Sequence, residues 1–330
     1  MVKQVQAYTA AIMLIIAAAL SGCGSLPQSA ALMAEPPSDI PPQAELTATP
    51  FYPQSEYQCG PAALATVLTT PERPVQPEDL VGLVYVPDRQ GSFQVEMVAA
   101  ARSYGRLAYP LKPRMEHILR EVAAGHPVLV FQNLGLSWSP VWHFAVVVGY
   151  DFTKSEVILR SGTTERETLL LRTFERTWKN GGYWARVILP SGELPATGEP
   201  FPVAKAAQDL ANTGHPQQAR ATYAAAVKRW PESSILQLGL GNLAYAAKDY
   251  AVAEAAFRRL VALQPEKAEG WNNLSYALAQ QGCDVAVEAA QCARALAPGD
   301  ATISTTSQDV AEILGRKSVV ACRIPGCPAL

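Results

Sequence analysis

Apolar residues follow three different patterns along the chain. Residues 10–20 are almost continuously apolar, a run of the length of a secretory signal core and too short for a membrane-spanning helix of about 20 residues. Residues 51–190 change from a helical period to an alternating one, and residues 203–300 repeat a fixed spacing. The 330-residue chain is therefore expected to form about two domains behind an N-terminal targeting segment.

The pattern within residues 51–190 predicts helices first and strands afterwards. Helices are expected over residues 61–70, between positions 92 and 105, and over residues 114–124. Ser92 is the expected N-cap of the second helix, and Gly105 and Gly125 stop the second and third. Strands are expected over residues 127–131, 141–151, 156–160, 166–171 and 183–189. Helices followed by an antiparallel meander predict an α+β domain.

Residues 203–300 contain an internal repeat of about one helix pair. The equivalent positions, at spacings of 34 and 33 residues, are Pro231, Pro265 and Pro298, with Ala219, Ala253 and Ala286 twelve positions earlier and Tyr223, Phe257 and Ala290 eight positions earlier. Gly214 and Gly282 fall at the turn within a pair, where Lys248 stands in the middle copy. The pattern resembles three tetratricopeptide repeats, which implies an all-α domain over residues 203–330, with a capping helix at 305–315. Such repeats usually bind a peptide or partner protein; an architectural role, or an ordinary helical bundle, is the alternative.

The N-terminal apolar run ends in Leu20-Ser21-Gly22-Cys23, which resembles the lipobox of bacterial lipoproteins. The resemblance implies a signal peptide over residues 1–22 and a lipid on Cys23, whereas a plain secretory signal is the alternative. Gly24, where an Asp would retain the protein in the inner membrane, implies the periplasmic side of the outer membrane. The proline-rich residues 23–50 are expected to be an extended tether, and residues 191–202 a linker.

Composition and charge narrow the classes of function. The chain is 49% hydrophobic and 17% charged, with a formal net charge of −2, so neither a nucleic-acid partner nor a polybasic membrane segment is expected. The sequence has no phosphate-binding Gly-Lys-Ser/Thr string and no metal-ligand cluster. We therefore expect no ATP, metal or other cofactor.

The six cysteines suit an oxidising compartment. Cys23 is the expected lipid site and Cys59 is a candidate reactive thiol. The four remaining candidates for disulfides are Cys283, Cys292, Cys322 and Cys327. A bond between the first two is disfavoured, because nine helical residues span about 13 Å. The C-terminal pair is expected to bond either to itself or back to the last repeat.

Cys59 stands at the start of an apolar helix, in Gln54-Ser-Glu-Tyr-Gln-Cys59-Gly60-Pro61-Ala. The positive end of a helix lowers the pKa of a thiol and favours thiolate. Gly60 is expected to let the chain approach a substrate, and Pro61 suits the first helical turn. The Gln54 amide and the Cys59 N–H could both donate to an oxyanion.

This motif is similar to that of the bacteriocin-processing double-glycine leader peptidases of the papain-like clan. His143-Phe-Ala-Val-Val-Val-Gly-Tyr-Asp151, 84 residues after the Cys59 thiol, resembles the strand that bears the histidine of that family. The resemblance covers about residues 51–190 and implies a papain-like cysteine peptidase, with Cys59 as nucleophile and His143 as base. The alternative for Cys59 is a buried structural thiol.

The third member of the site departs from the family, which places Asp or Asn on the next strand. A hairpin turning at residues 152–154 sets residues 161–163 opposite His143, and Ser161 stands there. A hydroxyl can orient an imidazole but stabilises imidazolium less than a carboxylate does. Asn133 on the preceding strand is the alternative partner.

The leading interpretation is a lipid-anchored thiol peptidase that acts on a peptide or protein in the periplasm. The rival is a non-catalytic lipoprotein in which a degenerate peptidase domain holds a peptide and the repeats recruit a partner. A third reading is acyl or peptidyl transfer through the same thiol, with an amine in place of water.

Overall fold

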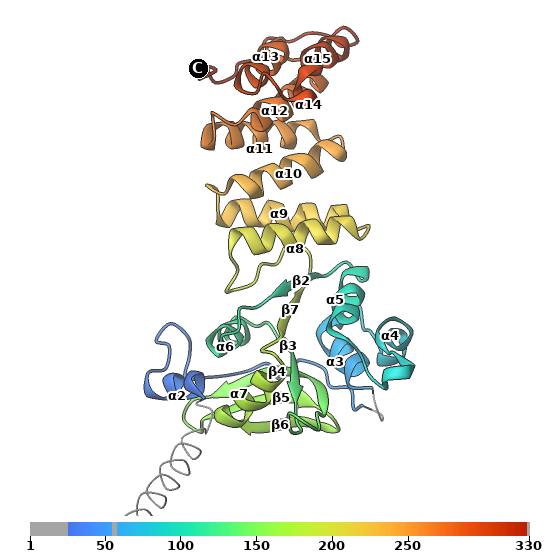
Figure 1. The fold of residues 1–330 in the computed structure, drawn as a ribbon, viewed down its shortest axis with the longest axis vertical. Coiled ribbons are helices and arrows are strands. Elements are labelled where there is room, and N and C mark those ends of the chain that lie inside the picture. Colours follow the sequence, from blue (N-terminus) through green and yellow to red (C-terminus); the bar gives the residue numbers. More distant parts are fainter. Residues whose placement is uncertain (1–25, 55–57, 329–330) are drawn as a thin grey trace, which may run out of the picture.

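The computed structural model describes residues 26–54 and 58–328, in which an α+β part is followed by a stack of helices (Figure 1). The first part contains α2 (Pro27–Ala34), β1 (Gln43–Glu45), α3 (Cys59–Leu68), α4 (Pro77–Val84), the 3-10 turn η1 (Pro87–Arg89), α5 (Gln94–Ser103), β2 (Leu107–Pro110), α6 (Met115–Ala123), β3 (Val128–Asn133), β4 (Trp142–Asp151), β5 (Glu156–Ser161), β6 (Thr164–Leu170), α7 (Leu171–Asn180) and β7 (Ala185–Leu189). The predicted order of an α+β fold and then an all-α fold is confirmed.

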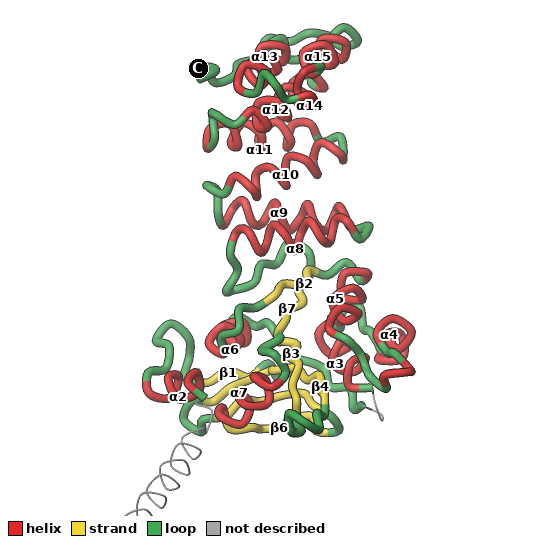
Figure 2. The backbone as a smooth tube through the Cα atoms, in the orientation of Figure 1, coloured by secondary structure: helices red, strands yellow, loops and turns green. Residues whose placement is uncertain are grey.

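The strands form one antiparallel sheet in the order β2-β7-β3-β4-β5-β6, with β1 added alongside β4 (Figure 2). The five expected strands are all present, but only β3 to β6 form the expected meander. After β6, helix α7 carries the chain back across the sheet. Strand β7 then pairs with β3 on the side away from β4, and so lies between β2 and β3. One sheet face packs against α3 through Phe144, Val146 and Val148, and the other packs against α6 and α7.

The predicted helix stops are confirmed and the predicted cap is wrong. Gly105 and Gly125 both have positive φ, at 73° and 94°, directly after α5 and α6, a conformation that glycine adopts without strain. Ser92, by contrast, lies two residues before α5 and does not cap it, because the N-cap position belongs to Phe93.

The expectation of an extended tether is wrong for the described residues 26–50. Helix α2 packs on α7, where the buried Glu175 carboxylate accepts the N–H groups of Gln28 (3.1 Å) and Ser29 (2.7 Å) and the Ser29 hydroxyl (2.5 Å). Strand β1 pairs with β4. A carboxylate aimed at free N–H groups stabilises a short helix start, so this proline-rich segment is part of the folded body.

The expected linker is also fixed in place. The fully buried Glu121 of α6 accepts hydrogen bonds from the N–H of Ala196 (2.9 Å), from the N–H (2.7 Å) and hydroxyl (2.6 Å) of Thr197, and from His126 Nδ1 (2.7 Å). The apolar core runs on from the sheet into the first helices after residue 199, through Val203 and Ala207. The two parts therefore share one core.

We expect Glu121→Ala to lower the free energy of unfolding by about 2–4 kcal/mol, because it leaves two buried N–H groups unpaired. Burial raises the pKa of Glu121, but the hydrogen bonds from His126 and Thr197 outweigh it, so the pKa lies below its usual value. This stabilisation is present at neutral pH and is lost as the pH falls through the folded-state pKa. Chemical unfolding at several pH values measures both effects. Glu116→Ala on the same helix, at a partly exposed ion pair with Arg120, is the control and should cost under about 1 kcal/mol.

The helical part consists of three pairs and a cap. The pairs are α8 (Pro200–Asn212) with α9 (Pro216–Arg229), α10 (Ser234–Ala246) with α11 (Tyr250–Leu263), and α12 (Ala268–Gln280) with α13 (Ala286–Leu296), followed by α14 (Ala301–Ser304) and α15 (Thr306–Leu314). The turn positions Gly214, Lys248 and Gly282 all have positive φ, at 89°, 61° and 79°, which confirms their equivalence. A Cβ built at Gly239 would lie 2.3 Å from the Tyr223 ring, so small residues admit the repeat aromatics.

Disulfides join Cys283 to Cys322 and Cys292 to Cys327 in the structure. Both bonds connect the C-terminal tail to the last repeat, which is the second of the arrangements considered from the sequence. Among residues 26–54 and 58–328, none of the helices combines the length and hydropathy needed to span a bilayer.

Candidate active site

Helix α3 brings Cys59 to the sheet. The thiol belongs to the first residue of the helix, and every residue from Gly60 to Leu68 is buried. Pro61 suits the first turn, because the N–H that proline lacks would have no partner within the helix there. The apolar helix therefore lies deep against the sheet and carries Cys59 to the N-terminal part of β4.

A gap in the sheet next to β4 receives the sulfur. The N–H of Phe131 donates to the carbonyl of Trp184, just before β7. Phe131 and Phe144 are therefore a non-hydrogen-bonded pair of the β3–β4 ladder, and their main-chain groups point away from each other. The N–H of Phe144 consequently points towards the side of β5, whose ladder with β4 begins only at Val146. That N–H is directed at the Cys59 sulfur. The thiol thus lies beside the residue that follows His143.

The electrostatic surroundings of Cys59 differ from the sequence expectation. Burial raises the pKa of the Cys59 thiol, and the N–H groups of Phe144, Gly60 and Cys59 itself oppose this rise without cancelling it. The expected helix effect is present in the N–H groups of Gly60 and Cys59, and the N–H of Phe144 on β4 adds to it, but desolvation of the thiolate is larger. The resting sulfur is therefore a neutral thiol.

The structure places the predicted third residue against the histidine. His143 Nε2 lies 2.9 Å from the Ser161 Oγ, and His143 is 6% exposed. Burial lowers the pKa of His143, while the negative charge of Glu167 raises it by a smaller amount. The imidazole is therefore neutral at neutral pH and able to accept a proton.

Asn133, the alternative partner, serves another purpose. It pairs with Trp142, one residue out of register with His143, and its Oδ1 accepts the N–H groups of Gly135 and Val141, both at 2.9 Å. Asn133 organises the loop before β4 and does not form a bond to the imidazole in this structure.

Glu167 is a charged neighbour of His143 that the sequence interpretation did not include. Glu167, on β6, lies opposite Leu159 of β5. Leu159 shares a sheet face with Ser161, since alternate residues of a strand point the same way. No short motif marks it; only the register of the β5–β6 hairpin brings it to the His143 face.

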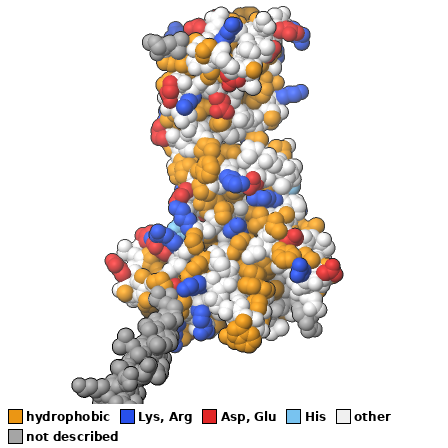
Figure 3. Space-filling model, viewed as in Figure 1, with side chains coloured by type: hydrophobic (Ala, Val, Ile, Leu, Met, Phe, Trp, Pro, Cys, Tyr) orange, Lys and Arg blue, Asp and Glu red, His pale blue; other side chains and the backbone are white. Residues whose placement is uncertain are grey.

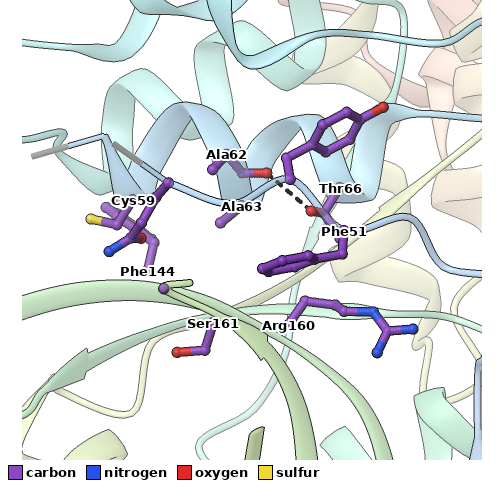
Figure 4. A pocket seen from close by; sticks show the side chains of 11 residues that line it. Phe51, Cys59, Ala62, Ala63, Thr66, Phe144, Arg160 and Ser161 are labelled. Carbon is purple, nitrogen blue, oxygen red and sulfur yellow. Dashed lines mark hydrogen bonds between the residues drawn. The ribbon is translucent and has the colours of Figure 1, made fainter. Parts of the chain in front are cut away.

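Gln54 belongs to the same pocket as the thiol. Its N–H donates to Gly162 (3.1 Å), directly after Ser161. The residues that line the pocket are Phe51, Tyr52, Gln54, Cys59, Ala62, Ala63, Thr66, Phe144, Arg160, Ser161 and Gly162. In Figure 4 the Cys59 sulfur and the Ser161 hydroxyl lie on one side of this pocket, and the Arg160 guanidinium points to the other. The pocket thus gathers three of the four predicted site residues.

Comparison with known proteins gives a family for each part of the chain. Residues 39–185 match the Peptidase_C39 like family. This part of the chain is a C39-like peptidase domain. Residues 205–265 and 238–301 match the tetratricopeptide repeat, so the chain carries a C39-like domain followed by such repeats. No curated protein matches the chain.

Solved structures resemble each part of the chain. A crystal structure of a Bacillus anthracis protein described as a C39-like peptidase has 19% identity and a TM-score of 0.38, and the match covers 44% of this chain and 97% of that one. The first tetratricopeptide domain of human RPAP3 has 17% identity and a TM-score of 0.33, covering 35% and 92%. An O-GlcNAc transferase mutant from Thermobaculum terrenum has 22% identity and a TM-score of 0.31, covering 34% and 23%.

Gly60 in the C39-like domain is needed for packing, whereas the sequence suggested a role in admitting substrate. A Cβ built there would lie 2.1 Å from Ser92 Oγ and 2.6 Å from Ser92 Cβ. We expect Gly60→Ala to lower the free energy of unfolding by about 1–3 kcal/mol, and Ser92→Gly in the same chain to restore most of it. Thermal unfolding measures the effect. Gly82→Ala, with open space around it on α4, is the control and should stabilise by about 0.5–1 kcal/mol. An equal loss in the single and double variants would contradict the packing role.

A second groove lies on the tetratricopeptide part. It is lined by Asn242, Tyr245, Phe257, Asn273 and Tyr276, and the Asn273 amide donates to Asn242 (3.2 Å). Across residues 26–54 and 58–328, His, Cys, Asp and Glu side chains form no cluster of three or more that could hold a metal ion.

Proposed function

We propose that the C39-like domain is a thiol peptidase in which Cys59 attacks the substrate carbonyl and His143 transfers the proton. The observation that carries the proposal is the thiol at the gap in the sheet, directed to the N–H beside His143, in a domain of a peptidase-like family. Gln54 lines the same pocket and is the proposed oxyanion donor, together with the N–H of Cys59.

The neutral thiol and the neutral imidazole define the order of events. As the sulfur attacks the carbonyl, its proton passes to His143, and the Ser161 Oγ orients the ring from Nε2. The imidazolium then protonates the leaving amine, which departs and leaves a thioester on Cys59. Water, deprotonated by His143, hydrolyses the thioester and returns the thiol.

We further propose that Cys23 carries lipid after removal of residues 1–22, and that the protein is held on the periplasmic side of the outer membrane. The lipobox-like string supports this proposal. The groove on the repeats is the proposed site for a peptide or protein partner, because its Asn and Tyr side chains offer hydrogen bonds to an extended chain.

Labelling with an electrophilic peptide tests the peptidase proposal. We expect a covalent adduct on Cys59, identified by peptide mass, and we expect free Gly-containing peptides to compete with it. The disulfide-bonded cysteines provide an internal control, since they lack a free thiol. Absence of an adduct on Cys59 in folded protein would sink the proposal.

The second candidate is a peptide-binding domain without hydrolysis. Two observations favour it, namely the hydroxyl of Ser161 where a carboxylate would stabilise imidazolium, and the raised pKa of Cys59. The two candidates differ in whether a bound peptide is recovered intact after long incubation.

A further inference from the structure

The body of the protein begins only a few residues after the proposed lipid site. Cys23 precedes Leu26, the first described residue, by three positions, and three residues span at most about 11 Å. Helix α2 follows at once and is clamped to α7 through the buried Glu175. A lipid on Cys23 would therefore keep the start of α2, and with it the packed helix α7, close to the bilayer.

The outer face of α7 carries an unpaired row of positive charge. Arg172, Arg176 and Lys179 are exposed at spacings of four and three residues, and hence lie on one helix face. The opposite face of α7 is buried through Phe174 and Trp178. None of the three cations forms an ion pair with the described part of the chain.

An uncharged apolar loop lies near the C-terminal end of α7. The end of α7 packs against the end of β3, where the Gln132 amide donates to Thr177 (2.6 Å), and β3 leads directly into residues 134–141. The exposed apolar side chains of this loop are Leu134 (49%), Leu136 (57%), Trp138 (80%) and Val141 (56%). Asn133 holds the backbone of this loop at both ends, because its Oδ1 accepts the N–H groups of Gly135 and Val141.

Exposed tryptophan and leucine beside unpaired cations form the pattern of an interfacial membrane contact. Figure 1 places α2 and α7 at the end of the molecule away from the repeats. The space-filling view carries blue Lys and Arg side chains and a protruding orange lobe at this same end (Figure 3).

We propose that the surface formed by α7 and residues 134–141 docks on a bilayer containing anionic phospholipid, with the three cations at the headgroups and Trp138 in the interface. This inference rests on the proposed lipid anchor, which brings the surface to the bilayer. Basic side chains are attracted to anionic headgroups and are screened by salt, and indole rings favour the level of the headgroups. Because residues 134–141 lead directly into β4, whose second residue is His143, docking would set the candidate active site close to the membrane.

Fluorescence quenching in vesicles tests the docking. Acylated full-length protein is reconstituted into phosphatidylethanolamine vesicles with or without phosphatidylglycerol, each containing brominated acyl chains that quench nearby indoles. The contribution of Trp138 is the difference between the native chain and Trp138→Phe. We expect this contribution to be clear on the anionic vesicles and to fall strongly on the vesicles without anionic lipid.

The variant Arg172→Gln/Arg176→Gln/Lys179→Gln should lose most of the Trp138 quenching on anionic vesicles. Lys248→Gln/Lys267→Gln/Arg294→Gln changes the same charge at exposed positions of the repeats and should keep it. Equal quenching in both triple variants, or no quenching of Trp138 in acylated protein, would overturn the docking proposal. The mass of the N-terminal peptide scores acylation of Cys23 separately, so a missing lipid overturns the anchor proposal and is not confused with a failure of docking.

Discussion

Cys59→Ala is expected to abolish peptide hydrolysis, with a fall in kcat of about 10⁴–10⁶-fold. The variant removes the only atom proposed to attack the carbonyl, and no covalent intermediate can form. His143→Ala should approach the same loss, since the nucleophile and its base act as one unit. Steady-state hydrolysis of a fluorogenic peptide, with single-turnover kinetics for the chemical step, measures both.

Loss of activity must be separated from loss of fold. Alanine fits at the first position of α3, because Ala62 and Ala63 already line the same pocket. The melting temperature of Cys59→Ala should therefore stay close to that of the native chain. Cys59→Ala protein that is folded and still hydrolyses the peptide at the native rate would contradict the assignment of the nucleophile.

Ser161→Asp is expected to raise the rate of hydrolysis by about 10- to 100-fold, the value of replacing a neutral hydrogen bond by a charged one. The carboxylate would stand next to His143 Nε2, where the hydroxyl is now at 2.9 Å. It would raise the pKa of His143, which burial lowers in the native protein, and so favour the imidazolium that forms during attack. The acidic limb of the pH profile should then move to higher pH.

Ser161→Ala and Glu167→Gln complete the series. Ser161→Ala should slow the reaction, and Glu167→Gln should have a smaller effect, because Glu167 acts through space and is partly screened by solvent. Glu167→Gln should move the acidic limb to lower pH, because the negative charge of Glu167 raises the pKa of His143. An unchanged rate in Ser161→Ala, with an acidic limb that stays in place in Ser161→Asp, would mean that Ser161 is only a packing neighbour. Hydrolysis that appears solely in Ser161→Asp would favour the non-catalytic candidate for the native chain.

The elements that the sequence predicted well are those with strong local signals. Helix α3 combines a continuous apolar run with a proline suited to its first turn, and β4 is apolar over almost its whole length because both of its faces are buried. The Ser161 position followed from the expected hairpin, and the structure places its hydroxyl at the imidazole.

The missed elements depend on distant partners. Residues 27–45 read as a tether because they are proline-rich, and they fold only because Glu175 and β4 supply hydrogen bonds from far along the chain. The sequence pattern predicts a strand up to residue 171 and no helix over α7, although Leu171, Phe174 and Trp178 have helical spacing. The shared core beyond residue 199 and the effect of Glu167 on His143 are properties of tertiary packing alone.

The pH dependence of Cys59 alkylation tests the central claim, that the thiol and His143 form a working pair of neutral groups. Burial lowers the pKa of His143 and raises that of Cys59. Alkylation by iodoacetamide in the native chain should therefore be base-assisted once the pH exceeds the lowered pKa of His143, and should rise again as the thiol ionises at high pH. In His143→Ala only the rise at high pH should remain. Superimposable profiles for the native chain and His143→Ala would contradict the account.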